Sequence, residues 1–342
     1  MKETENRKLT PFEDEDGYWG FTNESGEVII PPQYEEVGDF KEGMAWVCDE
    51  RGYGYINEEG ELAIPVKYSY ASDFENGTAI VEEGFKGLSY FIDKTGKKIG
   101  KGHYFDISPD FIDDITVGTL LSGKQILLNR KGLPVSNSYD MIESTEDEEH
   151  WYFEEKEIGG IMNSRGEVII YPGDFDFKCA YFSDGLMLVK KDGLYGYVNE
   201  EGKLAIPFKY EEAGDFYDGR AIVKYKGKAG YINPQGDPIG ELRYDEAYKF
   251  REKRGIVKKE EKWGFVDENG TEVIAPVYDL AYLFHEGLAA VMKGNKWGFI
   301  DSDGNEIIPF EYDFVWDFTN GKAEVTKDKR SFYIDKSGKE IK

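Results

Sequence analysis

Alternating large and small apolar residues predict a β-hairpin in the segment 296–309, which reads Lys-Trp-Gly-Phe-Ile-Asp-Ser-Asp-Gly-Asn-Glu-Ile-Ile-Pro. Trp297 and Phe299 are two residues apart, so both rings lie on one face of a pleated strand. The Asp-Ser-Asp-Gly that follows supplies the side-chain acceptor and the glycine that a tight turn requires. The extended pattern then resumes, and we expect Pro309 to end it, because proline cannot donate to a ladder.

The same hairpin recurs along the whole chain at a nearly fixed period. Tryptophan of the Trp-Gly pair becomes tyrosine in some copies and is lost in weaker ones. A regular spacing of this kind is the signature of a repeat architecture. The turn glycines of ten copies are 34 or 36 residues apart and are Gly26, Gly60, Gly96, Gly132, Gly166, Gly202, Gly236, Gly270, Gly304 and Gly338.

Each well-kept copy carries more than the hairpin. A tyrosine followed by an acid, as in Tyr312-Asp313, comes after the second strand, and a lone phenylalanine such as Phe318 comes next. A Gly-x-Ala-x-Val segment follows, as at 321–325, and its alternation predicts a third strand with a face of small residues. One repeat is therefore expected to be about three short strands in a meander, without an amphipathic helix.

With these elements the chain resembles the WG-repeat (KWG-repeat) family of bacterial proteins. The segments 262–265 and 296–299, both Lys-Trp-Gly-Phe and both followed by a turn Asp and Gly, carry the resemblance. The Tyr-Asp corner and the Gly-Leu-Ala segment at 287–289 add to it. The resemblance covers nearly the whole chain and implies an architecture. It implies little about activity, because the family is not known for catalysis.

We therefore predict an all-β fold, a tandem array of about ten three-stranded β-meander repeats in one unit over residues 1–342. An open, curved superhelix is favoured over a closed, propeller-like ring, because propeller blades usually have four strands. The segment 7–12, Arg-Lys-Leu-Thr-Pro-Phe, is either a first strand or part of a loosely ordered terminus. The expected divisions are a lead-in (1–16), regular repeats (17–88), degenerate repeats (89–185), regular repeats (186–330) and a truncated last repeat (331–342).

The degenerate repeats have two explanations that the sequence leaves open. The tryptophan position is occupied there by Ser89, Gln125 and Gly159. Sequence drift with substitutes that still fill the core is one explanation. A binding feature built on the irregular part of the array is the other, since proteins break their local rules mostly at functional sites.

Charge restricts the class of partner. The chain has 42 basic and 68 acidic side chains, a net charge of −26. Such a field repels nucleic acids and anionic membranes and favours basic partners. No apolar run is long enough to span a membrane, and the N-terminal segment has no signal-peptide pattern. We therefore expect a soluble, cytoplasmic protein that binds neither nucleic acid nor membrane.

Chemistry-bearing motifs are not found. Cys48 and Cys179 are 131 positions apart and are expected to be buried free thiols. The three histidines, His103, His150 and His285, share no metal-ligand spacing, so we expect no metal and interpret them as surface or incidental residues. The turn that begins at Asp301 is too short for an EF-hand and is interpreted as a hairpin turn. No catalytic or cofactor-binding motif is present, so we predict neither an enzyme nor a cofactor.

The leading hypothesis is a non-catalytic protein-binding scaffold that presents a broad acidic β surface to a basic protein. One alternative is an inhibitor or immunity protein that masks a basic toxin or nuclease by imitating its polyanion. Another is a carbohydrate- or cell-envelope-binding module that uses exposed aromatic rings. The sequence does not indicate the oligomeric state. The candidate contact patch combines acidic and aromatic side chains and consists of Glu146, Asp147, Glu148, Glu149, Trp151 and Tyr152.

Overall fold

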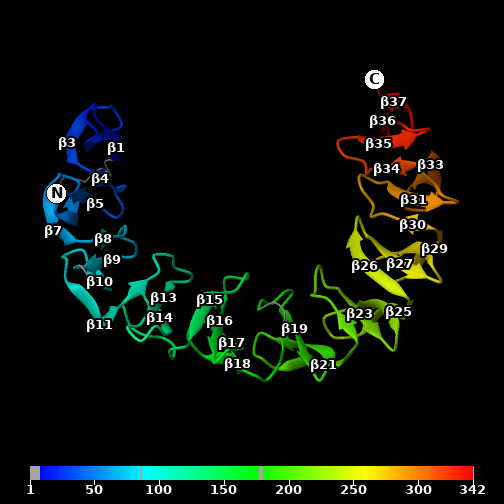
Figure 1. Ribbon diagram of the computed structural model, residues 1–342, viewed down its shortest axis with the longest axis horizontal. Coiled ribbons are helices and arrows are strands. Elements are labelled where there is room, and N and C mark those ends of the chain that lie inside the picture. The colour runs from blue at the N-terminus through cyan, green and yellow to red at the C-terminus, as the bar shows by residue number, and fades with distance from the viewer. Residues whose placement is uncertain (1–7, 85–86, 177–179, 342) are drawn as a thin grey trace, which may run out of the picture. The chain divides into compact units, whose positions relative to one another are not determined.

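The computed structural model describes residues 8–84, 87–176 and 180–341 and shows an all-β protein (Figure 1). The chain divides into two units, residues 1–174 (unit 1) and 175–342 (unit 2). Strands of the described residues form ten antiparallel sheets, seven with four strands and three with three. The same residues contain no helix, and hence none that could cross a membrane. The predicted all-β repeat fold is confirmed.

The sheets of unit 1 follow one another in chain order. Their strands are β1 (Thr10–Glu13), β2 (Trp19–Thr22) and β3 (Val28–Tyr34); β4 (Glu36–Val37), β5 (Met44–Asp49), β6 (Gly52–Asn57) and β7 (Leu62–Tyr68); β8 (Tyr70–Ala71), β9 (Thr78–Glu83), β10 (Leu88–Asp93) and β11 (Lys98–Tyr104); β12 (Asp106–Ile107), β13 (Ile115–Thr119) and β14 (Gln125–Asn129); and β15 (Met141–Ser144), β16 (His150–Glu155), β17 (Ile158–Asn163) and β18 (Val168–Ile170).

Unit 2 repeats the arrangement. Its strands are β19 (Leu186–Lys191), β20 (Leu194–Asn199) and β21 (Leu204–Tyr210); β22 (Glu212–Ala213), β23 (Ala221–Tyr225), β24 (Lys228–Ile232) and β25 (Pro238–Tyr244); β26 (Glu246–Arg251), β27 (Arg254–Lys259), β28 (Lys262–Val266) and β29 (Glu272–Tyr278); β30 (Leu280–Ala281), β31 (Ala289–Lys293), β32 (Lys296–Ile300) and β33 (Glu306–Tyr312); and β34 (Phe314–Val315), β35 (Lys322–Lys327), β36 (Arg330–Asp335) and β37 (Glu340–Ile341).

The prediction of three strands per repeat needs a correction. In the sheet β30-β31-β32-β33 the first strand, β30, has only two residues, too few to leave a periodic signature in the sequence. The small-residue strand β31 pairs with the Trp-Gly strand that follows it, so that Ala290 lies opposite Phe299. A sheet therefore begins just after the Tyr-Asp corner, and one residue, Asp313, joins β33 to β34.

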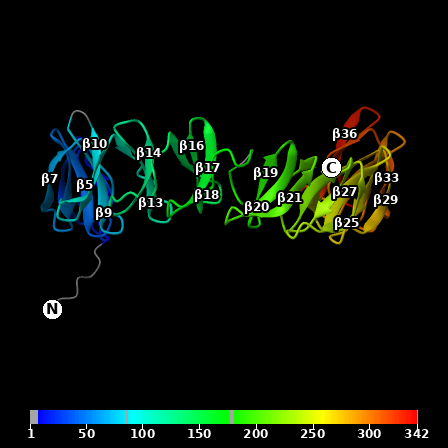
Figure 2. The ribbon, with the colours of Figure 1, turned by 90° about the horizontal axis from the view of Figure 1, so that it is seen from below.

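Strand number therefore no longer distinguishes an open array from a propeller-like ring, because most sheets have the four strands of a propeller blade. Within each unit the sheets are separate and none of them closes into a barrel. First strands such as β26 and β30 lie along one side of unit 2, and return strands such as β25 and β29 lie along the other (Figure 1). Figure 2 shows the same array from below. At the N-terminus the first-strand alternative holds for Thr10–Glu13, because this strand, β1, pairs with β2.

The core lies between consecutive sheets. Phe299 on one face of β32 packs with Phe318, Val325 and Ile334 of the following sheet. Ile300 on the other face packs with Phe265 of the preceding sheet. Both faces of the central strands are thus covered, which is why the Trp-Gly-Phe-Ile segment is almost continuously apolar.

An edge-to-face ring contact joins each well-kept sheet to the next. The rings of Phe299 in β32 and Phe318, after β34, lie 4.9 Å apart at 66°. Rings at this spacing prefer such a T-shaped arrangement, because the positive edge of one faces the negative face of the other. The burial of aromatic rings between repeats, predicted from the sequence, is confirmed. Equivalent pairs are Phe21–Phe40, Tyr55–Phe74, Tyr197–Phe216, Tyr231–Phe250 and Phe265–Phe284.

The glycine of the Trp-Gly pair makes room for a bulge in the partner strand. Trp297 lies opposite Tyr312 and Phe299 opposite Ile308, so β33 has two extra residues between these pairs. A Cβ at Gly298 would lie 2.7 Å from the carbonyl oxygen of Ile308. Pro309 therefore does not end the strand as predicted. It lies inside β33, at the bulge, where the missing amide hydrogen costs nothing.

The acid of the Tyr-Asp corner ties neighbouring sheets together. The Asp313 carboxylate accepts a hydrogen bond from Lys296 Nζ in β32 at 2.6 Å. Its other oxygen accepts the amide of Asp328, in the turn after β35 of the next sheet, at 2.9 Å. We call this three-part contact the corner clamp, and it explains the lysine of the Lys-Trp-Gly signature. The same clamp joins Lys124–Asp140–Lys156, Lys228–Asp245–Glu260 and Lys262–Asp279–Gly294.

The first prediction concerns the glycine beneath the bulge. Gly298→Ala is expected to lower the free energy of unfolding by about 1–3 kcal/mol, because the added methyl group overlaps the β33 backbone. The matched control is Gly214→Ala, where a Cβ would lie 4.0 Å from its nearest atom and φ is not positive. Urea unfolding of the two variants measures the difference. Equal midpoints for both variants and the parent would contradict the bulge account.

The second prediction concerns acid stability. Hydrogen bonds from lysine, and then from the turn amide, lower the pKa of Asp279 and Asp313. A carboxylate whose pKa is lower when folded stabilises the fold above its unfolded pKa of about 3.9, and that contribution is lost as pH falls. The double variant Asp279→Asn/Asp313→Asn should therefore lose less Tm than the parent between pH 7 and pH 3.

Thermal scans followed by circular dichroism across this range provide the measurement. Asp303→Asn, an exposed acid of the hairpin turn, serves as the control and should keep the parent's acid-induced fall in Tm. An unchanged fall in the double variant would show that the corner clamp is not charge-dependent.

Candidate functional site

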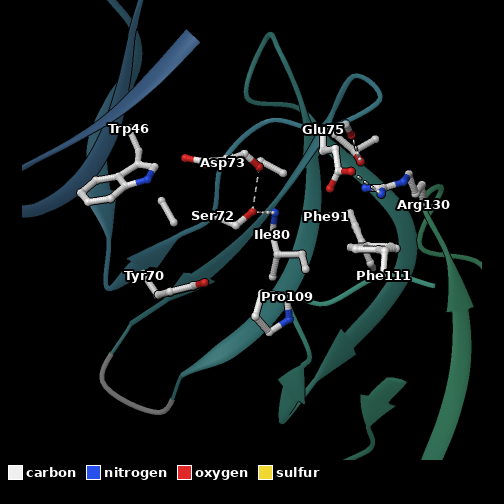
Figure 3. Close-up of a pocket in the computed structure, with 13 residues that line it drawn as sticks. Trp46, Tyr70, Ser72, Asp73, Glu75, Ile80, Phe91, Pro109, Phe111 and Arg130 are labelled. Carbon is white, nitrogen blue, oxygen red and sulfur yellow. Dashed lines mark hydrogen bonds and ion pairs between the residues drawn. The ribbon is translucent and has the colours of Figure 1, made fainter. Parts of the chain in front are cut away.

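A cavity opens in unit 1 where three successive sheets meet (Figure 3). Its volume is about 390 Å³. Trp46 comes from β5, Tyr70 from β8, and Phe111 and Arg130 from the third sheet and its turns. Polar and apolar groups both line it, and none of these four side chains belongs to a corner clamp. Phe111 also makes a ring contact with Phe91 of the preceding sheet, and Arg130 pairs with Glu75, so on this side the cavity wall also joins two sheets.

Aromatic and acidic groups form one half of this cavity. The Trp46 indole lies against Gly38, where any Cβ would overlap it. Tyr70 is about two-fifths exposed, and Asp73 extends toward Trp46 in Figure 3. Partial burial raises the pKa of Asp73, while the nearby Trp46 indole and Lys41 work in the opposite direction. Burial also raises the pKa of the Tyr70 phenol, with the charge of Asp73 adding to the rise.

An arginine forms the other half. Arg130 is 11% exposed, and its guanidinium carbon lies 3.9 Å from the centre of the Phe111 ring. Glu75 pairs with it at 3.1 Å, and Asp114 pairs with its Nε. The positive charge is thus balanced by two carboxylates and a ring face, which is a favourable environment for a partly desolvated guanidinium.

Unit 2 has a different groove beside its first strands β26 and β30. Its volume is about 550 Å³, and its lining is largely apolar and includes Tyr248, Trp263, Tyr282 and Leu283. The rings of Tyr248 and Trp263 lie 5.3 Å apart. Lys249 and Arg251 line this groove beside one acid, Asp317, whereas the unit 1 cavity is lined by two acids and one arginine. Such a surface suits flat apolar or amphipathic ligands rather than cations.

The residues of the predicted contact patch differ in their exposure to solvent. Trp151 is 3% exposed and packs in the core with Leu127 and Phe153, so its assignment to a contact surface is wrong. The Asp147 carboxylate belongs to the turn before β16, where Oδ1 accepts the amides of Glu149 and His150. Aromatic rings at strand positions serve the core here, as they do elsewhere in the array.

The other members of the patch lie nearer to solvent. The side chains of Glu146, Glu148 and Glu149 are exposed. Tyr152 is half-buried and donates its hydroxyl to Glu154 at 2.7 Å. The three glutamates stay a predicted contact surface, without the indole that the sequence placed beside them.

The structure also bears on the predictions for His150, for the turn at Asp301 and for the cysteines. His150 is 7% exposed and contacts Asp147, so of the two interpretations it is not a surface residue. Asp301 Oδ1 accepts the amides of Asp303 and Asn305, as expected for a hairpin turn. Cys48 is a free, half-buried thiol whose pKa is raised by burial, and Cys179 lies outside the described residues.

Sequence reasoning missed the unit 1 cavity, although two signals were present. Trp46 occupies a position of the Gly-x-Ala-x-Val strand where other repeats carry isoleucine, as at Ile80 and Ile222. Arg130 is the only arginine at its position in the hairpin turns, which elsewhere hold residues such as Glu58 and Ser302. Nothing in the sequence shows that these two side chains line one cavity, because they are 84 positions apart.

Comparison with known families decides the assignment. The family model described as "WG containing repeat" matches more than half of the chain, at residues 19–50, 53–84, 160–195, 195–228, 230–263, 263–297 and 297–330. The chain belongs to the WG-repeat family. Residues 85–159 are unmatched, yet the described part of this range, 87–159, forms sheets, so these WG repeats keep the fold after losing the signature. A repeat protein of this kind is a scaffold or binding module.

Several solved structures are remotely similar to this WG-repeat protein. A eukaryotic initiation factor is 11% identical, covering 99% of this chain and 96% of that one, with a TM-score of 0.38. BamB from Moraxella catarrhalis is 10% identical, covering 97% and 94%, with a TM-score of 0.26. The dihydro-heme d1 dehydrogenase NirN is 12% identical, covering 90% and 74%, at 0.30. Among curated proteins no relative is found. Likenesses this remote carry no functional information.

Proposed function

We propose that this WG-repeat protein is a non-catalytic scaffold that docks a basic protein on the acidic surface of unit 1. The observation that carries the proposal is the distribution of charge. Residues 1–174 contain 37 acidic and 16 basic side chains, a net charge of −21. Residues 175–342 contain 31 and 26, a net charge of only −5. Most of the field that attracts a cationic partner therefore comes from one unit.

The pairing of acids supports the same unit. In unit 2 the corner acids Asp245, Asp279 and Asp313 each bind a lysine, so part of the negative charge is neutralised within the fold. Unit 1 has the lysine-bound clamp at Asp140, whereas the corresponding corners at Ser69 and Phe105 carry no acid. Unit 1 also has exposed acids in the turn before β16, at Glu146, Glu148 and Glu149. Exposed charge of one sign speeds encounter with an oppositely charged protein.

The third prediction is a difference between units. The triple variant Glu146→Gln/Glu148→Gln/Glu149→Gln should weaken the binding of a lysine-rich peptide about tenfold at low salt. The matched control, Asp192→Asn/Glu200→Gln/Asp303→Asn, removes the same charge from exposed positions of unit 2 and should change it little. Titration of a fluorescent peptide between about 20 and 200 mM salt measures both affinities, and parent binding should fall steeply with salt. Tm should stay unchanged in both variants.

Three outcomes would count against the proposal. Equal losses in the two variants would remove the preference for unit 1. An unchanged affinity in the triple variant would remove Glu146, Glu148 and Glu149 from the contact surface. Binding that is insensitive to salt would favour the carbohydrate-binding alternative, since ring stacking on sugars carries no net charge. The same two variants, used to capture proteins from the source cell at low salt, should differ in the basic proteins released by a salt step.

A further inference from the structure

The unit 1 cavity has the properties of a subsite for one side chain. It is formed by three sheets, with a volume of about 390 Å³ near the lower end of the range for ligand pockets. Whole chain segments need longer grooves, whereas a single long side chain with ordered water fills a space of this size. Trp46 and Tyr70 provide ring faces on one side. Ring faces and nearby carboxylates together attract cations.

Acids around the cavity add to this preference. Asp73 lines it directly. Asp106 and Asp110 lie close enough for their charges to act on the Tyr70 phenol, and Asp39 acts on Asp73 in the same way. Acidic side chains therefore outnumber basic ones around the cavity, although Lys41 also acts on Asp73. An anion would meet repulsion from all four carboxylates.

The cavity's one arginine does not reverse this preference. Arg130 is already paired with Glu75 and Asp114 and lies over the Phe111 ring, so two carboxylates compensate its charge. It also shows how a guanidinium is held here, with a ring on one face and a carboxylate at its edge. Trp46, Tyr70 and Asp73 place the same two kinds of group on the opposite side of the cavity (Figure 3).

We infer that this cavity receives an arginine side chain of the basic partner, with the guanidinium between Trp46 and Tyr70 and paired to Asp73. The inference rests on the proposed function and specifies its anchor residue. Arginine is preferred over lysine because a planar guanidinium stacks on rings and binds a carboxylate through two parallel hydrogen bonds. Long-range charge brings the partner to unit 1, and this contact fixes its register.

The fourth prediction is tested with fluorine NMR on the full chain labelled with 5-fluorotryptophan. The chain has six tryptophans, and Trp46→Phe assigns the resonance of Trp46. The probe is the peptide acetyl-Gly-Ser-Arg-Ser-Gly-amide. Its citrulline analogue has nearly the same shape as arginine but no charge. Its lysine analogue has the positive charge but lacks the planar guanidinium. The arginine peptide should shift the Trp46 resonance, the lysine peptide should bind several-fold more weakly, and the citrulline peptide should leave it unchanged.

Variants separate the subsite from general charge attraction. Asp73→Asn and Tyr70→Ala change side chains that are exposed to solvent, and each should weaken the arginine peptide about tenfold. Asp303→Asn removes one acid from unit 2 and should have no effect. An unchanged affinity in Asp73→Asn, or an equal response to arginine and citrulline, overturns the inference. If the Trp46 resonance does not shift while the lysine-rich peptide still binds in a salt-dependent way, the inference is overturned and the proposed function stands. Loss of both responses overturns the proposed function as well.

Discussion

The edge-to-face contact between a ring of one sheet and a ring of the next is the interaction on which the structure depends. A sheet of four short strands has two faces to cover and cannot do so alone. Phe299 covers one face of its own sheet by meeting Phe318 at 4.9 Å, and the pair recurs in both units. Because the rings occupy the interior between sheets, they are not available for binding, and function is left to the turns and sheet edges.

The corner clamp divides the charged residues into two groups. Asp279 and Asp313 bind lysine and a turn amide, so their charge serves the fold. Exposed acids such as Glu146 and Glu148 serve no such contact among the described residues. Unit 2 contains more of the first group and unit 1 more of the second. A repeat protein can therefore vary its surface charge between units while keeping one fold.

Much of the fold could be predicted because the repeat signature consists of packing residues. Trp297, Gly298 and Phe299 each have a structural reason, namely ring burial, room for a bulge and contact with the next sheet. The short first strand β30 escaped prediction because two residues carry no period. The pairing of β31 with the following hairpin escaped it because a repeat has no marked beginning in the sequence.

The candidate site was less predictable. Trp151 was assigned to the surface because it stands beside an acidic run, whereas the strand period places it in the core. Trp46 was treated as a strand residue like its counterparts, although it lines a cavity with Arg130. Patterns along the chain identify what repeats. This site combines residues from three different sheets, some of which depart from the repeat pattern. It can be recognised only when the structure places those sheets side by side.

Hydrogen exchange in the variant Phe299→Ala tests most directly whether ring contacts hold successive sheets together. Truncating a buried phenylalanine costs about 3–5 kcal/mol, and about 1.4 kcal/mol corresponds to a tenfold change in an equilibrium constant. The account predicts that amides of the neighbouring sheet β34–β37 exchange about a hundredfold faster, while those of β22–β25 keep their protection. Faster exchange confined to β32, with β34–β37 unchanged, would contradict it.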